Sequence, residues 1–349
     1  MSDGSTNGAR KAKKIDGITP DRIVRLGHAF QESKVLLSAV ELGVFTALGE
    51  GPLDLDTLRT RIGIHERGAS DFLDALVALG MLERDDRGRY ANTTVTDLYL
   101  DRRKSTYVGG ELDHFNTYVY PHWNLLTPAL RTGKAQSGAR ATGHYPAMYA
   151  DQTALEIFVK GMTGATFSVA RAIAAKFPWQ NYKRVIDVGT AEGCLPLQIA
   201  QMHPHVIGGG FDLPPVKPLF DSYVQKHGLS DRLQFYAGDF FRDLLPTADV
   251  LVLGRVLHNW DLATKKMLLR KAHVALPVGG ALIVYERLID DKRRVNAAGL
   301  LASLHMLVMT EGGFDFTGTD CILWMREAGF RDIRIEPLTA DQSMVVGFK

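Results

Sequence analysis

The sequence lacks the features that mark exported, metal-binding or membrane-spanning chains. Its 349 residues include only two cysteines, Cys194 and Cys321, which provide neither a disulfide framework nor a metal-ligand spacing. No apolar run approaches the roughly 20 residues that cross a bilayer, and the N-terminus has no apolar signal core. A formal net charge of +2 creates no strong field toward nucleic acid or membrane surfaces. We therefore expect a cytoplasmic protein with no metal, nucleic-acid or membrane partner.

The composition is otherwise that of a globular protein with room for about two domains. Hydrophobic residues make up 46% of the chain and charged residues 23%, so core material is ample. Residues 1–17 are polar, and the basic run from Arg10 to Lys14 is too short to indicate nucleic-acid binding. We expect this segment to be a disordered tail.

Residues 18–98 show the order helix, helix, helix, hairpin that is typical of a winged-helix domain. Apolar residues recur at helical spacing from Phe30 to Leu48, and two shorter helical patterns follow at 55–62 and 69–79. Two short segments around the polar turn 85–88 then predict a hairpin. Such a domain either binds DNA or serves in dimerisation and substrate covering. Because nearby acids balance the arginines of the short helices, no basic DNA-binding face results, and the structural role is favoured.

Residues 99–178 are predicted to be largely helical and are rich in aromatic side chains. We interpret this region as a linker that also covers the substrate. His114, His122 and Trp123 are candidates for the lining of an apolar pocket, although each could equally belong to the core or to an interface.

Strands and helices alternate over residues 179–349, the pattern of an α/β domain with a parallel sheet covered on both faces. The last two strands have only a short connection, so we expect a hairpin in which the final strand runs antiparallel. The predicted strands are Arg184–Val188, His205–Asp212, Leu233–Ala237, Asp249–Arg255, Ala281–Leu288, Ile333–Leu338 and Met344–Phe348. The predicted helices are Leu195–Met202, Val216–His227, Ala263–Ala275, Ala297–Met309 and Gly318–Ala328.

The stretch Val185–Gly193 predicts a strand, a tight turn and the start of a helix. Such a turn lies at the carboxyl edge of a parallel sheet, where α/β proteins bind nucleotide-like ligands. Gly189 and Gly193 allow positive φ or a close ligand approach. Their G-x-x-x-G spacing differs from the dinucleotide fingerprint G-x-G-x-x-G, which argues against a nicotinamide cofactor.

Three acids, Asp187, Asp212 and Asp239, lie at the carboxyl ends of successive predicted strands. Ligands bind at that edge of an open sheet. The carboxylate of Asp212 can accept both hydroxyl protons of a ribose diol, and Asp239 beside Phe240 suits the amino group of a flat stacked ring. Three acids would repel phosphates, so a cationic, adenosine-like cofactor fits best.

His258 follows the fourth predicted strand, in the segment Leu257–Trp260. With an ordinary pKa of about 6.5, a histidine at a strand end is a natural general base, although a structural histidine is the simpler alternative. Glu286 lies near the end of the next predicted strand, and its carboxylate could orient the imidazole as the third member of a triad does. Asp315 is a second possible partner.

These motifs, taken in order, resemble the class I S-adenosylmethionine-dependent O-methyltransferases of the caffeate and acetylserotonin type, which include bacterial members from natural-product pathways. The resemblance covers about Arg25 to Lys349. It is carried by D-V-G-x-x-x-G at Asp187–Gly193, F-D-L-P at Phe211–Pro214, G-D-F-F at Gly238–Phe241, L-H-N-W at Leu257–Trp260, Glu286, and the turn Gly312–Gly313.

The resemblance implies a Rossmann-like catalytic domain at 179–349, preceded by a winged-helix dimerisation domain that makes the protein a homodimer. It implies S-adenosylmethionine as cofactor, with His258 as the base and Glu286 and Asp315 beside it. It places Met306 against the substrate. His122 and Trp123 are further substrate candidates, from the interpretation of residues 99–178 above. The implied cofactor-binding residues are Asp187, Gly189, Gly193, Asp212, Leu213, Asp239, Phe240 and Arg255.

The sequence departs from the family pattern D-x-G-G-G-x-G, because Thr190 and Ala191 replace the second and third glycines. Asp315 stands where many members have glutamate, and Gly254 where plant members often have lysine. We expect an O-methyltransferase acting on a hydroxyl of a small aromatic or polyketide-like acceptor. The alternatives are carbon or nitrogen methylation, a non-methylating enzyme on the same fold, or a winged-helix regulator that senses a ligand.

Overall fold

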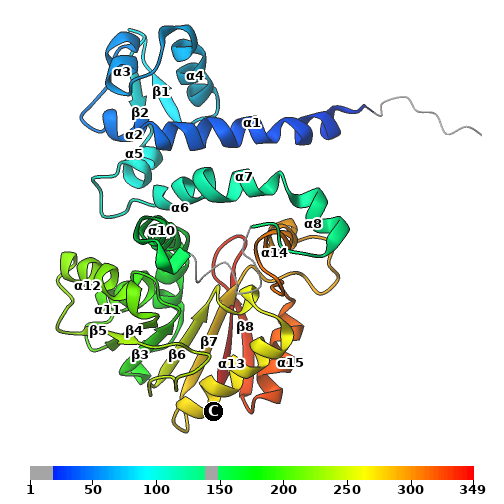
Figure 1. The fold of residues 1–349 in the computed structure, drawn as a ribbon. Coiled ribbons are helices and arrows are strands. Elements are labelled where there is room, and N and C mark those ends of the chain that lie inside the picture. Colours follow the sequence, from blue (N-terminus) through cyan, green and yellow to red (C-terminus); the bar gives the residue numbers. More distant parts are fainter. Residues whose placement is uncertain (1–18, 138–147) are drawn as a thin grey trace, which may run out of the picture.

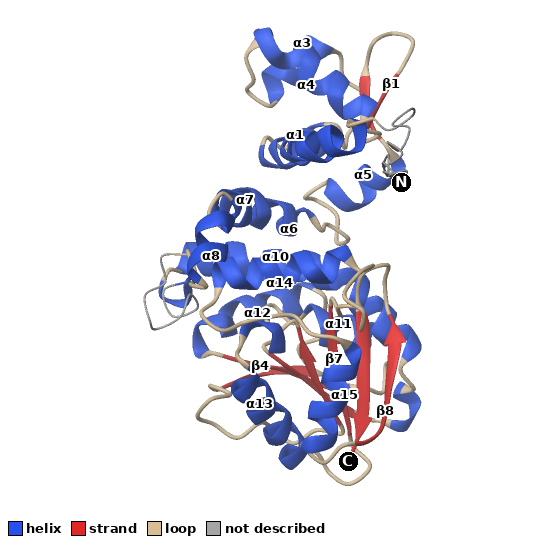
Figure 2. Ribbon diagram, turned by 90° about the vertical axis from the view of Figure 1, so that its right-hand side faces the viewer, coloured by secondary structure: helices blue, strands red, loops and turns tan. Residues whose placement is uncertain are grey.

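The computed structural model describes residues 19–137 and 148–349, so the tail expected at 1–17 lies outside the described residues. An N-terminal helical unit stands above a layer of helices, and that layer covers one end of a twisted sheet (Figure 1). Figure 2 shows the same three levels from the side.

The N-terminal unit has the predicted order of helices and a hairpin, with the first predicted helical region divided into two helices, α1 (Asp21–Glu41) and α2 (Val44–Ala47). Asp54 caps the helix that begins at Leu55 by accepting a hydrogen bond from Thr57 N–H (2.9 Å), as a short polar side chain does at a helix start. Its other helices are α3 (Leu55–Arg61), α4 (Glu66–Ala78) and α5 (Thr94–Leu100), and its strands are β1 (Leu82–Arg84) and β2 (Tyr90–Asn92).

The middle layer consists of one interrupted helix lying over one long helix. The upper helix begins as α6 (Gly109–His114), continues as the π-helical segment η1 (Phe115–Val119) and ends as α7 (Tyr120–Trp123). A π-helical turn inserts an extra residue and changes which side chains share a face. Below it lie α8 (Leu126–Thr132) and α10 (Gln152–Lys176).

The sheet has seven strands in the order β5-β4-β3-β6-β7-β9-β8. The chain runs outward from β3 in one direction and then from β6 in the other, so the strand order reverses between these two. Strand β9 pairs antiparallel with both β7 and β8, which confirms the predicted terminal hairpin. The strands are β3 (Arg184–Val188), β4 (Ile207–Asp212), β5 (Leu233–Ala237), β6 (Val250–Gly254), β7 (Ala281–Glu286), β8 (Arg331–Pro337) and β9 (Ser343–Phe348).

Both faces of the central strands are buried, which explains their continuous apolar sequences. Ile186 and Leu251 point to the face covered by α13 (Leu262–Ala275) and α15 (Gly318–Glu327). Their neighbours Val185 and Val252 point to the opposite face, against α10 and α11. The remaining helices are α11 (Cys194–Met202), α12 (Lys217–Lys226) and α14 (Ala297–Met309), with short 3-10 turns at η2 (Trp179–Asn181), η3 (Pro214–Val216) and η4 (Leu257–Asn259). In the described part of the chain, no helix has the length and apolar character to cross a membrane.

Candidate active site

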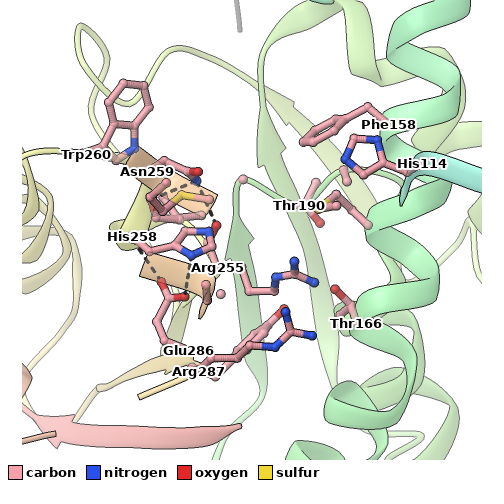
Figure 3. Close-up of a pocket in the computed structure, with 18 of the residues that line it drawn as sticks. His114, Phe158, Thr166, Thr190, Arg255, His258, Asn259, Trp260, Glu286 and Arg287 are labelled. Carbon is pink, nitrogen blue, oxygen red and sulfur yellow. Dashed lines mark hydrogen bonds and ion pairs between the residues drawn. The ribbon is translucent and has the colours of Figure 1, made fainter. Parts of the chain in front are cut away.

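A cavity of about 820 Å³ opens at the carboxyl ends of β3, β4, β6 and β7, under the middle helices (Figure 3). This is where the strand order reverses, the usual ligand site of an open α/β sheet. Many of the residues predicted from the sequence line it: Asp187, Gly189, Asp212, Leu213, Asp239, Phe240, Arg255, His258, Glu286, Met306, and Trp123 and His114 from the middle layer.

Three predicted residues lie outside the lining. Gly193 precedes α11 with a φ of 88°, and a Cβ there would lie 2.4 Å from the Phe220 ring, so the turn itself requires glycine. Nδ1 of His122 is 2.6 Å from the carbonyl oxygen of Tyr118 in its own helix. Asp315 is buried behind His258.

Asp212 organises the turn that follows β3. Its Oδ2 accepts a hydrogen bond from Ala191 N–H (3.0 Å) and its Oδ1 accepts one from Leu213 N–H (2.8 Å). The Tyr149 hydroxyl also donates to Oδ1 (3.3 Å). Burial raises the pKa of Asp212 to about 6, although these donors favour the ionised form. The carboxylate is therefore a preorganised acceptor at the cavity wall.

The two departures from the family's glycine run are accommodated differently. Thr190 fits because residue 210 in β4 is glycine: a Cβ on Gly210 would lie 2.1 Å from Thr190 Cγ2. Ala191 instead adopts a left-handed conformation with a φ of 51°, in which a Cβ is disfavoured by roughly 1–2 kcal/mol. One substitution is thus matched by a neighbouring glycine, and the other retains backbone strain.

Asp187 and Asp239 occupy different environments. Asp187 is buried, and burial raises its pKa to about 7, with the charge of Asp212 adding to the effect. Asp239 is half-buried, and its Oδ1 accepts a hydrogen bond from Phe241 N–H (2.9 Å) in its own turn. Phe240 lies beside Asp239 in the lining and packs edge-on against Trp260, with ring centroids 5.9 Å apart.

Arg255 brings a partly buried cation to the cavity from the turn after β6. Its backbone is left-handed, with a φ of 53°, and its N–H donates to the carbonyl of Tyr285 (3.0 Å). Buried Nη1 has no hydrogen-bond partner among residues 19–137 and 148–349, and it lies 4.0 Å from Oε1 of Glu111. A buried guanidinium nitrogen with no hydrogen bond, and only this long ion pair, favours an anionic ligand group beside it, because burying a polar group without a hydrogen bond costs free energy.

His258 is held from one side by two buried carboxylates. Its Nδ1 is 3.4 Å from Asp315 Oδ1. The same Nδ1 is 3.6 Å from Glu286 Oε2, and the backbone N–H of His258 donates to Glu286 Oε1 (3.3 Å) (Figure 3). Burial alone would lower the pKa of His258, but the charges of Glu286 and Asp315 outweigh it, and the pKa is raised. Nε2 on the other side of the ring is left for the cavity.

A fully buried lysine lies beneath this cluster. Lys265 of α13 donates to the carbonyl of Trp260, and its Nζ is 3.4 Å from the ring centroid of Phe314, a cation–π contact. Burial lowers the pKa of Lys265 to about 8, and the charges of Glu286 and Asp315 oppose that decrease. Lys265 thus connects the segments that carry His258 and Asp315.

Sequence patterns did not identify Lys265, Tyr149 or His305, although all three contact or line the site. His305 of α14 lines the cavity, and the indole Nε1–H of Trp123 donates to its Nδ1 (3.3 Å). Its position beside Met306, one of the predicted substrate residues, was the available signal. Nothing in the sequence around Lys265 distinguishes it from the exposed lysines of a surface helix.

Comparison with known proteins agrees with this geometry. The family model for the O-methyltransferase domain matches residues 123–331, and that for the O-methyltransferase dimerisation domain matches residues 24–102. The chain is 41% identical to the tetracenomycin polyketide synthesis 8-O-methyl transferase TcmO of Streptomyces glaucescens, over 95% of this chain and 97% of that one. It is 40% identical to the N,N-dimethyltransferase OxyT of Streptomyces rimosus, over 88% and 90% of the two chains.

A solved structure shows the same fold over nearly all of the chain. Human N-acetylserotonin methyltransferase in complex with S-adenosylmethionine superposes with a TM-score of 0.88 at 29% identity, covering 96% of this chain and 99% of that chain. The domain matches, the relatives and this shared fold lead to one conclusion. The chain belongs to the S-adenosylmethionine-dependent O-methyltransferase family.

Proposed function

We propose that this enzyme methylates a hydroxyl group of a small aromatic or polyketide-like acceptor, with His258 as the general base. The observation that carries the proposal is the two-carboxylate contact at Nδ1 of His258. It favours the tautomer with a proton on Nδ1, which leaves the lone pair of Nε2 for an acceptor hydroxyl. Nitrogen methylation is the second candidate, because OxyT, named as an N,N-dimethyltransferase, is 40% identical.

The residues around the cavity fit S-adenosylmethionine. The buried carboxylate of Asp212 suits a ribose diol. Nη1 of Arg255, which makes no hydrogen bond in the described residues, suits the carboxylate of an amino acid. Asp239 and Phe240 suit an amino-substituted ring, and Asp187 and Gly189 would flank the methionine end. When bound, S-adenosylmethionine supplies an electrophilic methyl group.

In this reaction the chain positions the acceptor and moves one proton. Neutral His258 takes the hydroxyl proton at Nε2 as the oxygen becomes methylated. Glu286 and Asp315 then stabilise the imidazolium, in the manner of the acid in a catalytic triad. A general base of this kind contributes about 10²–10⁴-fold to the rate.

We also propose how the other parts of the chain serve this reaction. Residues 18–98 would join two copies into a homodimer, since Ile23, Leu26 and Phe30 of α1 are exposed apolar side chains. Residues 99–178 would cover the acceptor, with Trp123 and Met306 against it. The enzyme would work in the cytoplasm, without metal, nucleic-acid or membrane partners.

Methyl transfer to matched phenols and anilines tests the proposal. Product formation would be followed by mass spectrometry with purified enzyme and S-adenosylmethionine, and cofactor affinity by calorimetry. We expect phenols to be methylated and anilines to be poor acceptors. Efficient aniline methylation would favour the nitrogen alternative. Cofactor binding without transfer to any hydroxyl acceptor would contradict the proposed reaction.

A further inference from the structure

The acceptor side of the cavity contains a histidine whose protonation is fixed by a tryptophan. Trp123 Nε1 lies 3.3 Å from His305 Nδ1. The two ring planes differ by only 8°, with centroids 6.4 Å apart, an edge-to-edge arrangement in which the N–H points at the imidazole nitrogen. The pair links α7 of the middle layer to α14 of the catalytic domain.

This hydrogen bond determines the tautomer of His305. An indole N–H can only donate, so Nδ1 of His305 must present its lone pair and the ring proton must be on Nε2. A second proton on the ring would set two N–H groups against each other. Burial and the positive charges of His258, His114, Arg255 and Arg287 act in the same direction and lower the pKa of His305 to about 3. His305 is therefore a neutral Nε2–H donor throughout the working pH range.

That donor has no assigned recipient. Nε2 of His305 makes no hydrogen bond within the described ranges of the chain. On the same helical face, Ala298, Leu301 and Ala302 also line the cavity, at the i, i+3, i+4 and i+7 spacing that places them with His305. His305 is thus the one polar member of an otherwise apolar wall in the described part of α14.

We propose that the acceptor carries a second oxygen, which accepts a hydrogen bond from His305 Nε2–H while His258 takes the proton of the reacting hydroxyl. The class that fits is a hydroxylated fused-ring aromatic with a ring carbonyl. An apolar wall with a single fixed donor recognises a flat, apolar ring system bearing one hydrogen-bond acceptor. This inference rests on the proposed O-methylation and adds the substrate feature that His305 selects.

Pairs of acceptors that differ only in the carbonyl test the proposal. Hydroxyfluorenones and the corresponding hydroxyfluorenes, with the hydroxyl at each ring position, would be compared by kcat/KM. We expect at least one fluorenone to exceed its fluorene by about 10- to 100-fold, since a buried donor left unpaired costs about 1–3 kcal/mol. His305→Leu should reduce this preference to about onefold, because the fluorenone loses its hydrogen-bond donor and the fluorene has none to lose. His305→Gln, whose amide replaces the Nε2 donor, should restore part of it.

Trp123→Phe separates positioning of the proton from simple packing. It removes the donor to Nδ1, so His305 can adopt the other tautomer, and the carbonyl preference should fall although the imidazole remains. The ¹⁵N shifts of His305 should report a single Nε2–H tautomer in the unaltered enzyme and a mixture in Trp123→Phe. A single Nδ1–H tautomer in the unaltered enzyme would overturn the assignment.

Binding measurements distinguish failure of this inference from failure of the proposed function. Acceptor affinity would be measured by calorimetry with S-adenosylhomocysteine, so that no turnover is needed. If fluorenones bind preferentially and His305→Leu abolishes the preference, but no methyl is transferred, the proposed reaction is wrong and the His305 contact stands. If His305→Leu changes fluorenone and fluorene equally in binding and turnover, His305 does not select a second oxygen.

Discussion

Substituting Gly210 with alanine should destabilise the enzyme strongly, because Thr190 occupies the space of the missing side chain. The added Cβ would lie 2.1 Å from Thr190 Cγ2 and 2.5 Å from its Cβ, well inside van der Waals contact. The strand that carries Gly210 and the turn that carries Thr190 cannot easily move apart. Gly210 pairs with Asp187 across β4 and β3, and the next residue of the turn, Ala191, is held by Asp212.

The size of the effect follows from this overlap. Overpacking a well-filled site costs typically 1–3 kcal/mol, and a β-branched threonine has few alternative rotamers, so we expect a loss near 3 kcal/mol. Adding Thr190→Gly to Gly210→Ala should recover about 2 kcal/mol by removing the clashing methyl. Urea unfolding, followed by tryptophan fluorescence, would give all four values of this double-mutant cycle.

The same chemical change at an open site provides the control. Gly68→Ala in α4 meets nothing within 4 Å and should be neutral or stabilising by up to about 1 kcal/mol. The two positions would be independent if the stability effects of Gly210→Ala and Thr190→Gly added to within about 0.5 kcal/mol in the double variant. That result would refute the account of how Thr190 is accommodated.

Four further predictions concern the site. His258→Ala should lower kcat by about 10²–10⁴-fold with unchanged S-adenosylhomocysteine affinity in calorimetry; full activity would exclude the base role. Ala191→Gly should leave urea stability equal or raise it by less than about 1 kcal/mol, because relief of the left-handed conformation exceeds the entropic cost of glycine; a clear loss would contradict the strain. The pKa of Asp212 is raised to about 6, so its carboxylate becomes protonated as pH falls through 6. Cofactor affinity should therefore weaken over that pH range, and Asp212→Asn should flatten the pH dependence of the affinity. Lys265→Met removes a cation that favours the ionised form of Glu286, whose pKa burial already raises to about 7. The midpoint of the acid limb of the kcat/KM pH profile should therefore move to higher pH, and an unchanged midpoint would exclude this role.

The sheet and its edge could be predicted from sequence because their signals are local. Strands buried on both faces are continuous apolar runs, and β3 and β5 have the predicted bounds. The ordered motifs place Asp212 and His258 at strand ends, where they indeed meet in one cavity. Comparison with the family pattern D-x-G-G-G-x-G also showed, from sequence alone, that Thr190 and Ala191 depart from it.

What the sequence did not reveal depends on contacts between distant segments. The match between Thr190 and Gly210 requires knowing that β4 lies beside the turn. The role of Lys265 depends on Phe314, which is far along the chain. His122 and Trp123 were equivalent candidates because helical periodicity assumes an uninterrupted α-helix. The π-helical segment before them determines which of the two side chains reaches the cavity, and no pattern in the sequence predicts that segment.

That π-helical segment, Phe115–Val119, makes the acceptor wall sensitive to chain length. An α-helix advances about 100° per residue, so removing one residue from η1 would turn Trp123 by about that angle relative to the preceding helix. The indole would leave His305, and the imidazole would lose the contact that fixes its proton. A single-residue deletion could therefore re-specify the acceptor more completely than replacing any lining side chain. Within this family, we expect insertions and deletions in the covering helix to coincide with changes of substrate.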